Sequence, residues 1–244
     1  MSSSLHNLTG DIARLSDGRI FGKVRAIQGI LVEIGGVQKF LSVGDRCTLI
    51  GRRDERVACE VVGFRDDRAL AMPFGALDGI GLGSAGEVGE SNSVAYPDNA
   101  WLGRVIDAFG EPLDGKGPID RGRGGYPVKQ TPPPAHDRGR VDGKIDLGVK
   151  SLNAFVTCCR GQRMGVFSAS GVGKSILLSM MARYSQADVI VIGLVGERGR
   201  EVKEFVEEDL GPEGLARSVL VVATSDESPL MRRQAAYMTM TVAE

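Results

Sequence analysis

The chain has 244 residues, with 30 Lys and Arg against 31 Asp and Glu, so its formal net charge is −1. This balance argues against a protein whose main activity is to grip a phosphate backbone along an open groove, which needs a basic surplus on one face. Its apolar content of 42% and charged content of 25% are ordinary for a globular protein and exclude a wholly disordered chain.

Other features narrow the class of protein. The longest apolar run, residues 189–195, is far shorter than the ~18–20 residues of a membrane span. Charges at 11, 14 and 17 interrupt the N-terminus where a signal peptide needs an apolar core, so secretion is not expected. The 4 cysteines lack CxxC spacing and there are 2 histidines, which argues against a zinc site or a disulfide framework. The 34 glycines indicate many tight turns or loops close to a ligand.

Residues 1–20 are predicted to be a partner-docking segment. Leu5, Leu8, Ile12 and Leu15 recur at helical spacing and form an apolar stripe, although Gly10 interrupts it. A frayed terminus is the alternative interpretation.

Residues 21–95 are predicted to form a small all-β barrel. A strand, a turn and a strand are expected over residues 22–36, with Gly35-Gly36 as a hairpin signal, and two strands over 57–64 and 69–74 are separated by a turn at 65–68. Short, regularly spaced strands favour a closed barrel, which leaves no exposed sheet edge.

Residues 96–145 are interpreted as a linker and entry segment, because they are rich in turn residues and include three consecutive prolines from Pro132. Residues 146–244 are predicted to be a partial α/β nucleotide-binding domain of the RecA-like type with a mostly parallel sheet. The expected strands and helices alternate along the chain: strands at 163–168, 188–195 and 218–223, and helices at 173–184, 201–210 and 230–244. The apolar strand 188–195 is expected to be covered on both faces.

The strongest motif is a phosphate-binding loop between an expected strand and an expected helix. Its backbone N–H groups would wrap phosphates, Lys174 would reach the β and γ oxygens of ATP, and the Ser175 hydroxyl would ligate Mg²⁺. The formal pattern opens with Gly, whereas this loop opens with Ser168. The predicted nucleotide-binding residues are Ser168, Ala169, Ser170, Gly171, Val172, Gly173, Lys174, Ser175 and Ile176.

Glu197 follows the next expected strand. Since ligands of open α/β sheets bind beyond the carboxyl ends of the strands, Glu197 and Lys174 should emerge on the same rim. A carboxylate there can polarise the water that attacks the γ-phosphate. Glu201 is interpreted as a residue that complements a helix dipole.

These motifs carry a family resemblance. The phosphate loop, the Gly-Glu-Arg-Gly-Arg-Glu-Val run at 196–202 and the Ser-Asp-Glu-Ser-Pro run at 225–229 resemble the catalytic subunits of rotary ATP synthases. The resemblance is closer to the protein-export ATPases of type III secretion. Residues 163–175, with Met-Met-Ala-Arg-Tyr at 180–184, look most like the flagellum-specific ATP synthases, which are the flagellar export ATPases. Residues 103–115 match the family's segment between barrel and nucleotide domain.

The resemblance implies roles and partners. The residue matching Glu197 activates the attacking water, and the one matching Lys174 binds phosphate. It also implies a homo-hexamer, docking of the N-terminus to a stator-like regulatory protein, and work with the export gate and chaperone–substrate complexes at the inner face of the cytoplasmic membrane.

Three parts that the family needs are not seen between Ser225 and Glu244: a Walker-B strand ending in Asp, an arginine finger and an aromatic residue for adenine. Asp226, after strand 218–223, is an imperfect Walker-B candidate. We therefore expect an N-terminal part of a longer ATPase, truncated before the Walker-B strand. On its own this chain is expected to bind MgATP weakly and not to hydrolyse it.

Alternatives remain open. Within the same class, the chain could come from an injectisome secretion ATPase or a rotary synthase subunit. An RNA-dependent helicase-like factor would need basic and aromatic residues on the barrel, but residues 20–95 hold only four phenylalanines as aromatics, so no nucleic-acid partner is expected. A natively truncated, non-enzymatic binding module is the third reading.

Overall fold

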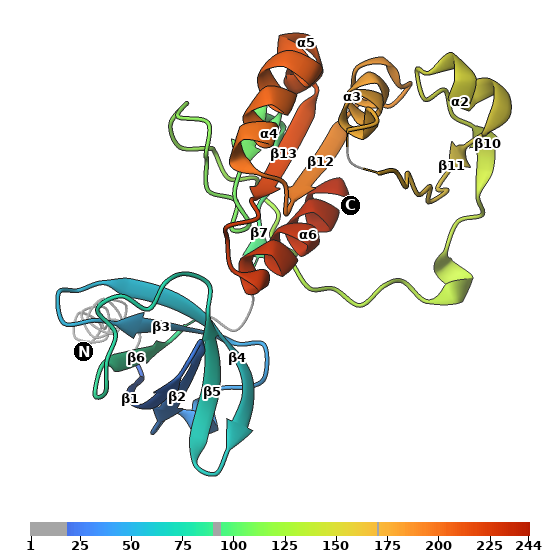
Figure 1. Ribbon diagram of the computed structural model, residues 1–244. Coiled ribbons are helices and arrows are strands. Elements are labelled where there is room, and N and C mark those ends of the chain that lie inside the picture. The colour runs from blue at the N-terminus through green and yellow to red at the C-terminus, as the bar shows by residue number, and fades with distance from the viewer. Residues whose placement is uncertain (1–18, 90–93, 170) are drawn as a thin grey trace, which may run out of the picture. The chain divides into compact units, whose positions relative to one another are not determined.

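The structure is a computed structural model that describes residues 19–89, 94–169 and 171–244. The chain divides into two compact units, Met1–Asn92 and Ser93–Glu244 (Figure 1). The apolar stripe expected at residues 5–15 lies outside the described residues. In the described part of the chain, no helix is both long and apolar enough to cross a membrane.

The first unit is a closed six-stranded barrel, which confirms the expected all-β barrel. Its strands pair in the order β1-β2-β5-β4-β3-β6 and close on themselves. Their bounds are β1 Phe21–Gln28, β2 Leu31–Gly35, β3 Arg46–Ile50, β4 Arg56–Arg65, β5 Arg68–Pro73 and β6 Ala85–Val88, with the short 3-10 helix η1 at Gln38–Phe40. Alternate side chains of β5 are buried, and these inward positions fill the barrel core.

The turns of the barrel differ in part from the expectation. The turn at residues 65–68 is confirmed, because Arg65 pairs with Arg68 where β4 meets β5. The Gly35-Gly36 hairpin signal is wrong: the β1–β2 hairpin turns at residues 29–30, and β2 ends at Gly35. The second neighbour of β2 is β5, not the strand that follows it in sequence. The glycine pair therefore lets the chain leave the sheet instead of reversing it.

The second unit contains a three-stranded parallel sheet, in the order β12-β13-β8. The strands β12 Ile190–Val195 and β13 Ser218–Ala223 were expected, and their parallel pairing is confirmed. The third strand, β8 Arg104–Ile106, comes from the segment that sequence analysis interprets as a linker. Every residue of β13 is buried, whereas those of β12 are half-buried or exposed, so the expectation that residues 188–195 are covered on both faces is wrong for the described part of the chain.

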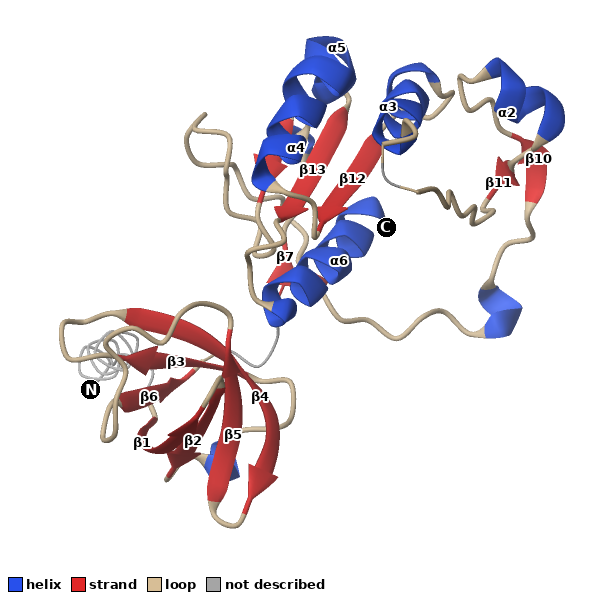
Figure 2. Ribbon diagram, in the orientation of Figure 1, coloured by secondary structure: helices blue, strands red, loops and turns tan. Residues whose placement is uncertain are grey.

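Helices cover both faces of β13 (Figure 2). Val219, Val221 and Ala223 share a core with α6 Pro229–Ala243, while Leu220 packs with residues of α3 Lys174–Tyr184 and of the π-helix η4 Phe205–Leu210. This alternation is the period of two expected of a strand. Two short helices flank η4, α4 Gly199–Glu204 and α5 Gly211–Ala216.

The remaining elements are short. Strand pairs β7–β9 and β10–β11 are antiparallel, and Trp101, in the 3-10 helix η2, is buried. The bounds are β7 Val94–Ala95, η2 Asn99–Trp101, β9 Tyr126–Pro127, η3 Ala135–Asp137, β10 Asp142–Lys144, α2 Lys150–Phe155 and β11 Cys159–Arg160.

The strand expected at residues 163–168 does not form. Residues 161–169 form a loop (Figure 1), and Phe167 within it is 96% exposed. A strand needs a neighbour for its N–H and C=O groups, and none of the described strands pairs with this segment. Periodicity identified a β-prone run there, but pairing decides whether such a run becomes a strand.

The carboxylate of Asp114 ties β8 to the loop after it. Arg104 donates from Nε to Oδ2 of Asp114 at 2.7 Å and from Nη2 to Oδ1 at 2.9 Å. The backbone N–H groups of Val105 and Lys116 donate to the same carboxylate. These hydrogen bonds, with that of the guanidinium as the largest, hold the pKa of Asp114 well below its usual range.

Asp114→Asn is therefore expected to lower the urea midpoint of this unit at pH 7. Because the carboxyl pKa is lower in the folded state, its stabilisation is fully present above the unfolded pKa of about 3.9 and is lost as the pH falls through the folded pKa. The difference between wild type and variant should thus shrink as the pH drops below about 4. A difference that stays constant from pH 7 to pH 3 would contradict this assignment.

Candidate functional site

The phosphate-loop residues lie at the N-terminus of α3. The helix begins at Lys174, and Gly173 before it has a φ of +92°, in the left-handed region that favours glycine. Gly171 also has a positive φ, of +76°. Since Gly173 has no side chain to cap the helix, the N–H groups of the first turn stay available to an anion.

Space for a phosphate adjoins these glycines. A Cβ atom placed on Gly171 or Gly173 would meet no atom within 4 Å. Ser168, Ala169, Val172, Ser175 and Ile176 are all exposed, while Ser170 lies outside the described residues. The loop thus has the open backbone that phosphate binding needs, although Ser168 does not end a strand as the sequence predicts.

The side chains of Lys174 and Glu197 lie close together beside this loop. Lys174 Nζ lies 3.6 Å from Glu197 Oε1, and their side chains are 42% and 38% exposed. Lys174 is the first residue of α3, and Glu197 follows the end of β12. The two residues that sequence analysis expects on one rim are therefore in contact, with opposite charges that are still open to solvent.

The fit of Mg²⁺ depends on Ser175. Its exposed hydroxyl follows Lys174 in the first turn of α3, and a neutral oxygen beside a phosphate is a donor that Mg²⁺ accepts. No cluster of three or more His, Cys, Asp or Glu among the described residues offers an all-protein cage. The donor set therefore fits a metal that arrives with phosphate oxygens and keeps water ligands.

Two acidic neighbours have other partners. Glu201 lies in the first turn of α4, where Arg198 Nη1 is 3.3 Å from its Oε1; this placement agrees with dipole complementation. Asp226 follows β13, and donation from the Thr224 side chain lowers the pKa of its carboxyl.

The ends of β12 and β13 are joined by a contact that was not predicted from the sequence. The N–H of Ser225 donates to the carbonyl of Glu197 at 2.9 Å. The motif at 225–229 was noted in the sequence only as part of a resemblance. The predicted parallel pairing of the two strands could have indicated this contact, because the residues after β12 and β13 then leave the sheet side by side.

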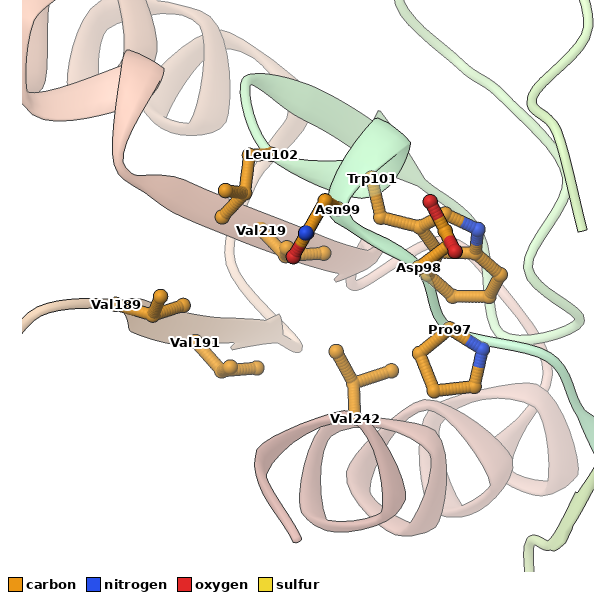
Figure 3. A pocket seen from close by; sticks show the side chains of 9 residues that line it. All are labelled: Pro97, Asp98, Asn99, Trp101, Leu102, Val189, Val191, Val219 and Val242. Atoms are coloured by element: carbon orange, nitrogen blue, oxygen red, sulfur yellow. The ribbon is translucent and has the colours of Figure 1, made fainter. Parts of the chain in front are cut away.

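A pocket of about 390 Å³ lies at the other end of the sheet (Figure 3). Its lining combines apolar side chains with the polar Asp98 and Asn99, and the Asp98 carboxylate accepts from the N–H of Ala100. Val189, Val191 and Val219 come from the beginnings of the strands, whereas Lys174 and Glu197 lie at the carboxyl end. The pocket is therefore separate from the candidate phosphate site. Its lining is Pro97, Asp98, Asn99, Trp101, Leu102, Val189, Val191, Val219 and Val242.

Several known proteins are similar to this chain in sequence and in fold. Residues 148–244 match the ATP synthase alpha/beta family, nucleotide-binding domain. The chain is 52% identical over 240 residues to the flagellum-specific ATP synthase of Caulobacter vibrioides. This alignment covers 98% of this chain and 54% of that protein. It is 44% identical over 239 residues to the type 3 secretion system ATPase of Xanthomonas euvesicatoria, covering 97% of this chain and 53% of that protein.

A solved structure agrees with both units. The assembled ATPase EscN in complex with its central stalk EscO, from the enteropathogenic E. coli type III secretion system, matches with a TM-score of 0.82 and 33% identity, covering 91% of this chain and 53% of that chain. The chain spans about half the length of the relatives it matches.

Proposed function

We propose, from the homology of this chain to the flagellum-specific ATP synthases and from its Lys174–Glu197 pair, that the protein it belongs to is the ATP-binding and ATP-hydrolysing motor subunit of the flagellar type III export apparatus. The observation that carries the proposal is the 3.6 Å contact between Nζ of Lys174 and Oε1 of Glu197 beside an open phosphate loop. Hydrolysis would be coupled to the export of flagellar proteins.

Binding would use the positive end of α3. Its first N–H groups and the Lys174 ammonium would hold the β- and γ-phosphates, where the helix dipole favours negative charge. The Lys174 ammonium also lies 3.6 Å from the Glu197 carboxylate. An incoming phosphate would compete for Lys174 and release the carboxylate of Glu197.

Hydrolysis would then use that carboxylate. Glu197 would accept a hydrogen bond from water, orient it toward the γ-phosphorus and take up its proton, a role worth roughly 10²–10⁴-fold in rate. Mg²⁺ bound with ATP at Ser175 would neutralise charge on the phosphates. Lys174 would stay on the phosphate oxygens as negative charge shifts toward the leaving group.

The experiment that tests the proposal is phosphate release by the full-length product of the gene, combined with flagellar protein export in a strain that lacks this gene. ATP turnover together with restored export is the expected result. Absence of turnover under conditions that support a relative would contradict the assignment.

A virulence-type secretion ATPase is the second candidate, because the Xanthomonas relative is 44% identical. The 52% identity to a flagellum-specific relative favours the flagellar role. Export of injectisome proteins instead of flagellar proteins in the same assay would reverse that order. A rotary synthase subunit or a non-enzymatic binding module would restore neither.

We also propose a homo-hexamer, located peripherally at the inner face of the cytoplasmic membrane, that works with the export gate and chaperone–substrate complexes and binds no nucleic acid. The assembled state of EscN and its complex with a central stalk support an assembly of this kind. In this proposal residues 1–20 dock a stator-like regulatory protein.

Deleting residues 1–18 is expected to weaken recovery of the stator-like protein in a pull-down, because it removes an apolar stripe suited to a partner helix. The barrel, whose described strands begin at Phe21, should stay folded by circular dichroism. Equal recovery with and without the segment would favour a frayed terminus.

A further inference from the structure

The position of the Glu197 carboxylate is set mainly by the backbone at this residue. It lies beyond the last residue of β12, and its side chain is 38% exposed, so packing holds the carboxylate only loosely. Its contact with Lys174 is one that a phosphate would displace. What then fixes the carboxylate relative to the phosphate loop is the path of the chain through residues 196–197.

That path is bonded to the end of β13. The N–H of Gly196 donates to the carbonyl of Ala223 at 2.7 Å, and the N–H of Ser225 donates to the carbonyl of Glu197 at 2.9 Å. These two bonds extend the parallel ladder past the ends of both strands. The place of Glu197 is therefore set by the conformation of the chain just after β13.

Glu227 fixes that conformation. Its Oε1 accepts the N–H of Thr224 at 3.1 Å, and its own N–H donates to the carbonyl of Thr224 at 3.1 Å. The reciprocal pair closes a tight loop around Ser225. The Ser228 hydroxyl then accepts the N–H of Met231 and starts α6, so the loop is anchored at both ends.

We propose that Glu227 is a positioning residue for the proposed hydrolysis: through the Thr224–Ser228 loop it holds the Ser225 N–H on the Glu197 carbonyl and so aims the Glu197 carboxylate. The inference rests on the proposed function. Glu227 touches neither nucleotide nor water in this account, and its effect should pass entirely through Glu197.

The test uses the full-length product with Glu227→Ala and Glu227→Met, which both remove the acceptor, the second with a side chain of similar length. A displacement of about 1 Å at a reacting group can cost ~10²-fold, so kcat should fall by roughly 10- to 100-fold. KM and the affinity for a fluorescent ADP analogue should stay unchanged. Glu227→Gln should restore kcat, since its amide oxygen still accepts the Thr224 N–H. Glu213→Ala, an exposed carboxylate on α5, is the matched control.

A double-mutant cycle separates positioning from general damage. In a Glu197→Gln background, the Glu227 variants should lower kcat no further than about twofold, whereas independent effects multiply. An equal loss in both backgrounds, or wild-type kcat in Glu227→Ala and Glu227→Met, would overturn the inference. If Glu227→Ala lowers the melting temperature, Glu227→Met and Glu227→Gln still decide, because they differ in the acceptor at nearly constant size.

Failure of the proposed function has a different signature. If Glu197→Gln alone keeps wild-type turnover, the role of Glu197 is wrong, whatever the Glu227 variants do. If Glu197→Gln lowers turnover but the Glu227 variants lower kcat by the same factor in both backgrounds, only the positioning role of Glu227 is wrong.

Discussion

Lys174→Ala in the full-length product is expected to lower ATP turnover by at least about 10²–10³-fold, the cost of losing one preorganised donor to developing charge. Two effects act in the same direction. The variant loses the ammonium that faces the β- and γ-phosphates, and it leaves Glu197 without the cation that lies 3.6 Å away. An uncompensated carboxylate beside the phosphate loop repels ATP, so affinity should fall as well.

The measurement is phosphate release together with equilibrium binding of a fluorescent ATP analogue. Lys203→Ala is the matched control, because Lys203 is an exposed lysine of the same unit that pairs only loosely with Glu207, at 3.9 Å. Turnover in Lys174→Ala equal to that of this control would remove the phosphate-loop assignment.

Glu197→Gln is expected to separate binding from hydrolysis. The amide keeps the shape of the side chain but cannot take a proton from water, so turnover should fall by roughly 10²–10⁴-fold. The variant also loses the negative charge that lies 3.6 Å from the Lys174 ammonium. Nucleotide affinity should therefore be equal to or higher than that of the wild type, because the ammonium is already free for phosphate.

Steady-state kinetics and direct binding must be recorded on the same preparation, with Glu213→Gln as the control for a lost carboxylate. A decrease in turnover below tenfold would indicate that Glu197 has a structural role. A parallel loss of affinity would mean that the carboxylate supports the loop.

Much of the secondary structure could be predicted from the sequence because its signals are local. Short β-prone runs bounded by turn residues predict β1, β2, β4 and β5 of the barrel, and apolar, mostly β-branched runs predict β12 and β13. The barrel is closed, and β12 and β13 pair in parallel, as expected. These patterns survive because each strand is selected by the face it buries.

What the sequence could not show depends on pairing between distant segments. β8 joins β13 from more than a hundred residues away, and no local pattern in its three residues indicates that. Residues 163–168 have the composition of a strand, but none of the described strands pairs with them. The prediction of a hairpin at Gly35-Gly36 is wrong for the same reason. Two glycines favour a turn, but they do not show that the second neighbour of β2 is β5, which lies further along the chain.

For the candidate site, the sequence predicts only which edge of the sheet carries it. The rule on strand ends put Lys174 and Glu197 at the same edge, and the structure has them in contact; their catalytic roles stay predictions. The support of Glu197 by Ser225 and Glu227 needed the structure, because residue type does not show which carbonyl the Ser225 N–H meets or that the Glu227 carboxylate accepts the Thr224 N–H.

The account is tested most directly by measuring bound ATP and released phosphate on the same sample of the full-length product, for the wild type, Lys174→Ala and Glu197→Gln. We expect the wild type to bind and hydrolyse, Glu197→Gln to bind without hydrolysing, and Lys174→Ala to do neither. Phosphate release by Glu197→Gln or Lys174→Ala at the wild-type rate would contradict the claim that these two residues form the ATPase site.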